Sequence, residues 1–236
     1  MNLYEYNNSK EVPTLFLHGF LGSSDSWEEC IKIIKTYCIT LNMPGHQDNY
    51  FNEKDTNYTI DNWCSELKTE LDKRSIQSIN LCGYSMGGRL AINFASRYPS
   101  LVNNLILEST TPGIKSKKER MVRYNSDLEL CNKIESDYMN FIIDWEKNSL
   151  FEHQFQKNKE QFLMQQKIRL SHKPSQICRS LKVFSQGRLE DKHSSISNFK
   201  FSVNIINGAL DEKYTSIGKL MHSLCKNSMH HILNCG

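Results

Sequence analysis

The chain alternates short apolar runs with longer amphipathic segments. The apolar runs end in glycine or polar turn residues, as buried strands do, and they predict strands at 14–18, 37–41, 79–82, 102–107, 203–206 and 231–233. Between them, apolar residues recur at helical spacing at Ile60, Trp63, Leu67 and Leu71, at Leu90 and Phe94, and at Ile217, Leu220 and Leu224. Strands that alternate with helices predict a mostly parallel sheet flanked by helices.

A serine framed by glycines follows the apolar run 79–82. The string Gly83-Tyr84-Ser85-Met86-Gly87 stands between that predicted strand and a helical pattern from Arg89 to Arg97. In this strand-turn-helix setting, a G-x-S-x-G motif exposes a nucleophilic serine at the carboxyl edge of a sheet. The sequence therefore resembles the α/β-hydrolase fold, with Ser85 as the catalytic serine. A simple glycine-rich turn is the alternative.

A second turn, Leu17-His18-Gly19-Phe20-Leu21-Gly22, comes directly after the first predicted strand. In the α/β-hydrolase fold, an early turn supplies one backbone donor of the oxyanion hole, and the residue after the nucleophile supplies the other. We therefore expect the backbone N–H groups of Phe20 and Met86 to stabilise developing negative charge. We interpret His18 as a structural part of its turn rather than a catalytic group.

Asp211 stands where this fold places the acid of a serine-centred triad. It follows the apolar run 203–206 after a short Asn-Gly-Ala-Leu link, and triad members follow the order serine, acid, histidine. We expect this carboxylate to orient and support an imidazole. Capping of the following helix is the alternative role.

The triad histidine is expected in the loop after the last predicted strand. His230 and His231 stand where that strand begins, so we expect neither to reach Ser85, and we interpret His222 as a surface residue. We therefore expect the histidine just after Gly236, followed by a last helix, and interpret the sequence as a fragment. A chain complete at this point would have severely impaired catalysis.

The segment 114–186 breaks the alternation of strands and helices. It contains no glycine and a single proline, Pro174, and it is rich in charge. Its aromatic residues include Tyr138, Phe141, Trp145, Phe151 and Phe155. This composition favours helices, so we expect a helical cap at 114–177 and an α/β core made of 1–113 and 178–236. A peripheral pair of helices is the alternative.

Composition narrows the classes of partner. The 236 residues suit one domain with an insertion, and a formal charge of +3 gives no basic field for nucleic acid. The first residues do not show a basic stretch followed by an apolar one, and no apolar run approaches the ~18 residues of a membrane span, so we expect no membrane partner. Eight scattered cysteines without a C-x-x-C pair predict a reducing, cytoplasmic location. We expect neither a metal nor another cofactor, and the oligomeric state stays open.

An arginine near Ser85 points to a substrate that carries carboxylates. Arg89 lies one helical turn after Ser85 and on the same face, where it can meet a substrate carboxylate, although an ordinary surface arginine is the alternative. Distinctive strings occupy residues 17–23, 83–89, 108–114, 119–123, 144–145, 167–170 and 208–213. Together they resemble the 2-succinyl-6-hydroxy-2,4-cyclohexadiene-1-carboxylate (SHCHC) synthases of menaquinone biosynthesis, across nearly the whole chain.

The resemblance implies a lyase that eliminates pyruvate from 2-succinyl-5-enolpyruvyl-6-hydroxy-3-cyclohexene-1-carboxylate to give SHCHC. Ser85 would start proton abstraction as base or base relay, supported by Asp211 and the absent histidine. The substrate would contact Arg89, Arg123 and Arg169 through its carboxylates, with Tyr84, Trp145 and the Phe20 region lining the pocket. Arginine clamps suit a small polycarboxylate substrate. One departure is the loop 43–47, which lacks the glycine that usually follows its histidine.

Two other functions stay open on the residues alone. A carboxylesterase, thioesterase or carbon-carbon hydrolase shares the fold and the triad. A non-catalytic binding protein would keep the pocket and lack the histidine.

Overall fold

A seven-stranded sheet runs through the structure, which is a computed structural model that describes residues 1–147 and 158–234. Its strands are β1 (Leu3–Tyr6), β2 (Thr14–Leu17), β3 (Cys38–Leu41), β4 (Ile79–Tyr84), β5 (Val102–Glu108), β6 (Ser202–Gly208) and β7 (Ser228–Leu233). They lie in the order β1-β3-β2-β4-β5-β6-β7. Only β1 runs antiparallel to its neighbour among these described strands, which confirms the mostly parallel sheet.

The direction of strand addition reverses at the centre of the sheet. From β2 the chain adds β3 on one side, then crosses back to add β4 and the later strands on the other side. In open α/β sheets, ligands bind where the carboxyl ends of two strands flank such a switch. Leu17 pairs with Gly83 in the β2–β4 register, so the two glycine-containing turns leave the sheet side by side.

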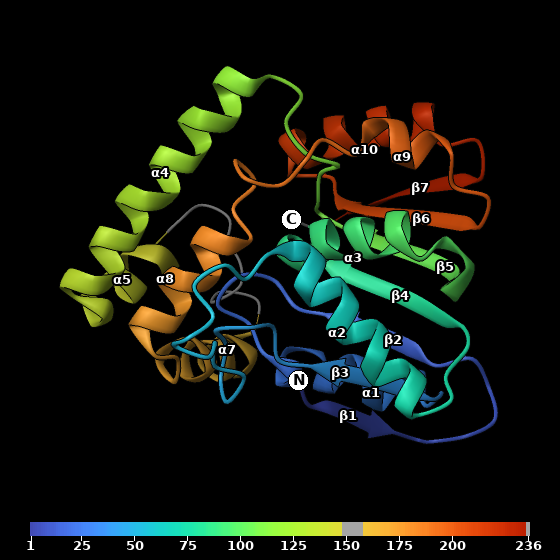
Figure 1. The fold of residues 1–236 in the computed structure, drawn as a ribbon, viewed down its shortest axis with the longest axis horizontal. Helices are drawn as coiled ribbons and strands as arrows, with labels where there is room; N and C mark the ends of the chain where they lie inside the picture. Colours follow the sequence, from blue (N-terminus) through green and yellow to red (C-terminus); the bar gives the residue numbers. More distant parts are fainter. Residues whose placement is uncertain (148–157, 235–236) are drawn as a thin grey trace.

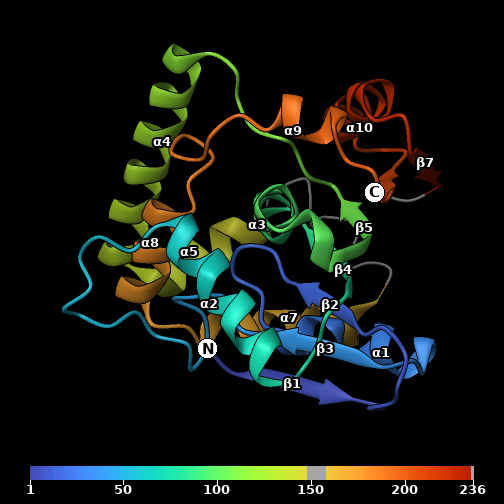
Figure 2. The same cartoon turned by 45° about the vertical axis from the view of Figure 1, so that its right-hand side comes forward.

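Helices cover both faces of the sheet (Figures 1 and 2). They are α1 (Glu28–Ile34), α2 (Ile60–Lys73), α3 (Met86–Arg97), α4 (Lys117–Ser136), α5 (Tyr138–Glu146), α7 (Lys159–Leu170), α8 (Pro174–Val183), α9 (His193–Ser197) and α10 (Glu212–Leu224), with short 3₁₀ turns at Ser24–Trp27 and Pro99–Leu101. Alternate side chains of β2 point to opposite faces of the sheet. Leu15 and Leu17 join the large core under α2 and α3, whereas Phe16 packs with Ile31 of α1.

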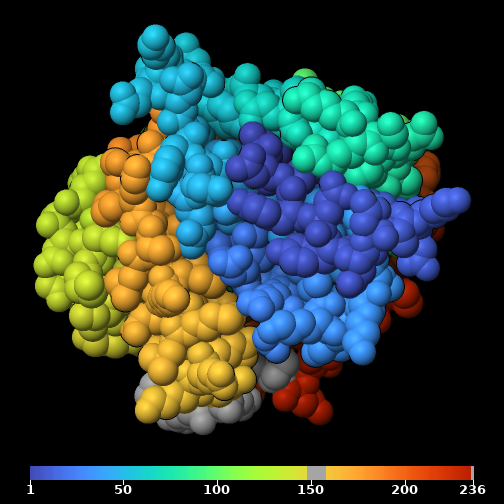
Figure 3. Space-filling view, turned by 90° about the horizontal axis from the view of Figure 1, so that it is seen from below, coloured from blue at the N-terminus to red at the C-terminus, as the bar shows by residue number. Residues whose placement is uncertain are grey.

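The helices α4, α5, α7 and α8 follow β5 and precede β6, and they gather beyond one end of the sheet (Figures 1 and 2). They enclose a hydrophobic cluster of their own. Its buried members are Leu21, Cys131, Ile134, Phe141, Ile142, Ile177, Cys178 and Leu181. All except Leu21, which comes from the turn after β2, belong to the inserted helices. Figure 3 shows the segment of α7 and α8 lying against the amino-terminal segment.

The boundaries of the expected cap are only partly visible. The expected break between residues 177 and 178 falls inside α8, so this helix continues across it. Phe151 and Phe155 lie outside the described residues. The role of these helices as a cap therefore stays a prediction.

Two strands differ from the sequence prediction. β1 was not predicted, because its residues Leu3-Tyr4-Glu5-Tyr6 carry one buried apolar side chain and form an edge of the sheet. β7 begins at Ser228 rather than His231, since backbone pairing with β6 holds polar residues in the strand. Among the described residues, no helix combines the length and the apolar character that crossing a membrane requires.

Candidate active site

Ser85 occupies a strained turn between β4 and α3. Its φ of +50° lies in the left-handed region, which is rare for a residue with a side chain. The Ser85 N–H donates to the carbonyl of Glu108 at 2.9 Å, and its own carbonyl accepts from the Thr110 hydroxyl at 2.7 Å. Such strain persists only where the surroundings fix the residue, and both contacts come from β5 and the turn after it. This is the elbow that the motif predicted.

Close backbone approaches hold the elbow against the turn after β2. A Cβ on Gly83 would lie 2.6 Å from the Gly87 carbonyl carbon, and one on Gly87 would overlap the Leu17 carbonyl oxygen. A Cβ on Gly19 would lie 2.8 Å from the Tyr84 ring and 3.7 Å from the Ser85 Cβ. The sequence therefore brings Gly19, and with it the next peptide, directly beside Ser85.

The two expected oxyanion donors lie on these turns. Met86 is the first residue of α3, so its N–H is one of those that have no partner inside the helix. Phe20 follows Gly19 in a tight turn that the Gly22 N–H closes on the Gly19 carbonyl at 3.1 Å. The Phe20 ring contacts Trp145 edge-to-face, with 5.8 Å between centroids.

Asp211 lies at the start of α10 and acts as its N-cap. Its Oδ1 accepts from the Tyr214 N–H at 3.0 Å, which is the helix-capping role considered from the sequence. The Ala209 N–H donates to the Leu233 carbonyl at 2.7 Å, so the chain leaves β7 beside the Asp211 loop. This is the side of the sheet where a triad histidine would have to stand. The expected histidine, after Gly236, falls outside the described residues.

The nearby histidines are engaged elsewhere. The His230 and His231 imidazoles contact the Asn207 and Asn204 side chains at 2.8 and 3.1 Å, inside the β6–β7 pair. On α10, His222 contacts the Ser228 hydroxyl at 2.8 Å and is exposed. Each of these three imidazoles therefore has a side-chain partner on β6 or β7.

Arg89 is a buried cation on α3. Its side chain is 8% exposed, and its Nε has no hydrogen-bond partner among the described residues. The pKa of the guanidinium is lowered to about 10, chiefly by burial; the charge of Arg123 also lowers it, whereas Tyr214 and Asp127 oppose the shift. Such a group favours an anionic ligand. Sequence reasoning did not find Tyr214, whose position depends on how α10 packs.

The other two arginines lie on the inserted helices and have protein partners. Arg123 Nε lies 2.9 Å from the buried Asp127 carboxylate, and its Nη1 donates to Gln186 at 3.1 Å. Arg169 pairs with Glu146 at 2.8 Å, and both side chains are 7% exposed. Sequence reasoning missed these partners. The i,i+4 spacing of Arg123 and Asp127 was the one local signal.

Three buried imidazoles lie in a row behind the turn after β2. The middle ring, His46, contacts His18 and His172 edge-to-face, with 4.8 and 5.1 Å between ring centroids, respectively. Each ring accepts one backbone N–H, His18 from Met43, His46 from Leu21 and His172 from Gln47. Burial lowers the pKa of His18 to about 3 and of His172 to about 4, and it lowers that of His46 well below 6.5. All three rings are therefore neutral near pH 7.

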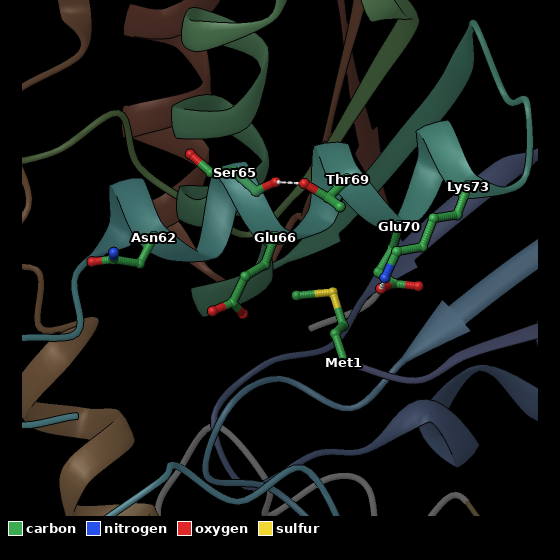
Figure 4. Close-up of a pocket in the computed structure, with 7 residues that line it drawn as sticks. All are labelled: Met1, Asn62, Ser65, Glu66, Thr69, Glu70 and Lys73. Carbon is green, nitrogen blue, oxygen red and sulfur yellow. Dashed lines mark hydrogen bonds and ion pairs between the residues drawn. The ribbon is translucent and has the colours of Figure 1, made fainter. Parts of the chain in front are cut away.

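A hollow in the surface lies apart from these site residues. It has a volume of about 340 Å³ and lies between Met1 and α2, lined by residues such as Glu66, Glu70 and Lys73 (Figure 4). None of the site residues described above lines it. Within 1–147 and 158–234, no three metal-ligating side chains form a group that would hold a metal ion.

Comparison with known proteins agrees with this geometry. A family model described as alpha/beta hydrolase fold matches residues 12–183. The putative 2-succinyl-6-hydroxy-2,4-cyclohexadiene-1-carboxylate synthase of Bacillus subtilis is 32% identical over 90% of this chain and 78% of its own. The solved structure of MenH from S. aureus superposes with a TM-score of 0.91 at 31% identity, over 98% of this chain and 88% of that one.

The chain belongs to the SHCHC synthase family of the alpha/beta hydrolase fold. A relative of the same name from Klebsiella pneumoniae is 23% identical over 88% of this chain and 81% of its own. The resemblance found in the sequence strings is thus confirmed.

The contacts of the elbow predict that alanine substitutions of Gly87 and Gly88 destabilise the protein to different extents. Gly87→Ala should lower the free energy of unfolding by more than about 3 kcal/mol, because the new methyl meets backbone that cannot rotate away. Gly88→Ala meets the Thr110 side chain and should cost about 1–3 kcal/mol. Urea unfolding measures both, with Ser96→Ala on the same helix as a control. Equal costs for the two glycines would contradict the described approach.

The buried imidazoles predict a loss of stability in mild acid. Their pKa values are lower in the folded state than the unfolded value near 6.5, so the unfolded chain binds more protons as the pH falls. Each ring should therefore remove up to about 1.4 kcal/mol per pH unit between pH 6 and about pH 4, with the full contribution present above pH 6.5. Urea unfolding at pH 7, 6 and 5 measures the slope. His172→Gln should make it shallower, and an unchanged slope would contradict this account.

Proposed function

We propose that this chain is a lyase that eliminates pyruvate from 2-succinyl-5-enolpyruvyl-6-hydroxy-3-cyclohexene-1-carboxylate to give SHCHC. The observation that carries the proposal is the buried Arg89 guanidinium, one helical turn from Ser85, whose Nε has no partner among the described residues. A cation buried in this way beside the elbow suits an anionic substrate. A neutral ester substrate gives no reason to bury it.

The chemistry of the substrate sets what the site has to do. The C2 proton, next to the succinyl carbonyl, is removed, and its electron pair forms the C2–C3 double bond. The C3–C4 double bond then moves to C4–C5, and the C5–O bond breaks. The enolpyruvate that leaves takes up a proton and becomes pyruvate.

Proton removal places negative charge on the succinyl carbonyl oxygen. The N–H groups of Phe20 and Met86 are proposed to donate to that oxygen, because they flank Ser85 on the two turns. Ser85 would take the C2 proton directly or relay it to a histidine. Asp211 would orient that histidine, since Asp211 lies beside the point where the chain leaves β7.

The three substrate carboxylates would be held by arginines on two sides of the site. Arg89 belongs to the core, whereas Arg123 and Arg169 belong to the inserted helices. Asp127 and Glu146 keep the latter two side chains oriented before substrate arrives. Trp145 and Tyr84 would line the pocket between these arginines, because Trp145 contacts the Phe20 ring and the Tyr84 ring lies against Gly19. The inserted helices would thus form a cap that completes the site.

A coupled assay tests the proposal. The full-length gene product is mixed with the enolpyruvyl substrate, and pyruvate is followed through lactate dehydrogenase and NADH. Pyruvate release that Ser85→Ala abolishes supports the lyase. Rapid turnover of p-nitrophenyl esters with an acyl-serine burst and no pyruvate would favour the hydrolase alternative.

Substitution of Arg89 should weaken the use of the substrate. Arg89→Gln should lower kcat/KM for pyruvate release about 10- to 150-fold, because a charge-assisted bond to a carboxylate is worth about 1.5–3 kcal/mol. Arg97→Ala serves as the matched control, because this arginine lies on the same helix and pairs with Asp61 at the exposed surface. Arg97→Ala should leave kcat/KM within about twofold. Equal losses in the two variants would overturn the role of Arg89.

A further inference from the structure

The peptide backbone of Leu21 is held from two sides by histidines. Its N–H donates to His46 Nε2 at 3.2 Å, and its carbonyl lies 3.1 Å from His172 Nε2. The His46 ring comes from the loop after β3 and the His172 ring from the connection between α7 and α8. Sequence separations of 25 and 151 residues make both contacts products of the fold.

The backbone N–H group that each ring accepts fixes which of its nitrogens carries the proton. The Gln47 N–H donates to His172 Nδ1 at 3.1 Å, so Nδ1 is the acceptor and the proton of the neutral ring is on Nε2. His172 therefore donates to the Leu21 carbonyl. His46 accepts at Nε2, which puts its proton on Nδ1. Leu21 is thus matched by one acceptor and one donor.

Leu21 needs this support because its backbone is strained. Its φ is +62°, in a turn of Gly19 to Gly22 whose third position requires a positive φ and usually takes glycine. A leucine there carries a steric cost, so the conformation depends on its surroundings. In return, the Leu21 side chain is 1% exposed and sits in the cluster of the inserted helices.

The preceding residue is Phe20, the proposed oxyanion donor. Its N–H belongs to the Gly19–Phe20 peptide beside Ser85, and the direction of that N–H follows from the dihedral angles of the same four-residue turn. A donor is effective only when it is held at the right place before the charge forms. Loss of the hold on Leu21 would therefore move the donor without removing any group that touches substrate.

We propose that His46 and His172 are positioning residues that lock the Leu21 peptide and thereby fix the Phe20 N–H, so that docking of the α7–α8 connection completes the oxyanion hole. The catalytic part of this proposal rests on the lyase function proposed above. The structural part, the lock on Leu21, stands independently of the reaction.

Paired substitutions of His172 separate positioning from packing. His172→Gln keeps an N–H donor at the Nε2 position, whereas His172→Phe keeps the ring shape and loses both hydrogen bonds. We expect His172→Phe to lower kcat for pyruvate release about 10- to 100-fold with KM within about threefold, and His172→Gln to recover most of the loss. Ile134 lies in the same hydrophobic cluster as Leu21. Ile134→Val and Ile134→Ala should cause losses of stability below and above those of the His172 variants, and both should leave kcat within about twofold.

Hydrogen exchange of the Leu21 amide gives a readout that needs no activity. His46→Phe removes its acceptor and should speed exchange of that amide at least about 10-fold beyond the change in either Ile134 variant, and His46→Gln should restore protection. Exchange that matches the Ile134 variants would overturn the lock. The lock would also be overturned if the wild type releases pyruvate and the His172→Gln variant has a kcat as low as that of His172→Phe. If the wild type releases no pyruvate, the proposed function fails, and the exchange rate still decides whether the histidines hold Leu21.

Discussion

Gly87 lies so close to the carbonyl groups of Leu17 and His18 that no side chain fits between them. This contact joins the first turn of α3 to the end of β2, across the switch point of the sheet. The elbow and the turn after β2 are placed by this contact. Gly19 comes beside Ser85, and the Met86 and Phe20 N–H groups come to the same edge. The strained serine is held by Glu108, the last residue of β5, and by Thr110 in the turn after it.

The features that sequence predicted well are those fixed by neighbours in the chain. The elbow needs glycine at set positions, and α2 shows its buried face through Trp63, Leu67 and Leu71. β1 escaped prediction because an edge strand with one buried residue has little apolar signal. The partners of Arg169 and Leu21 escaped it because they come from distant segments, and no local spacing encodes such contacts.

The same distinction separates the three arginines. Arg123 and Arg169 each lie against a carboxylate of the chain, so their charge is largely compensated before any ligand binds. Arg89 lies on the helix after Ser85, and burying its guanidinium without a partner for Nε among the described residues costs folding free energy. A carboxylate of the substrate would remove that cost on binding. The strained backbone of Ser85 and the buried guanidinium of Arg89 both cost folding free energy at the edge of the sheet where the reaction is proposed to take place.

The position of Leu21 joins the inserted helices to the turn after β2 and so gives the proposed cap a second role. A cap that lifted as one body would pull Leu21 out of its apolar cluster and break the contact with His172, leaving a positive φ without its donor. The proposed cap, when docked, and the proposed oxyanion turn, when ordered, would therefore be one state in energetic terms. In that state the proposed substrate ligands Arg123 and Arg169 would act together with the proposed backbone donors. Binding energy that the carboxylates gain on the cap would then also hold the turn in the conformation in which it can stabilise the enolate.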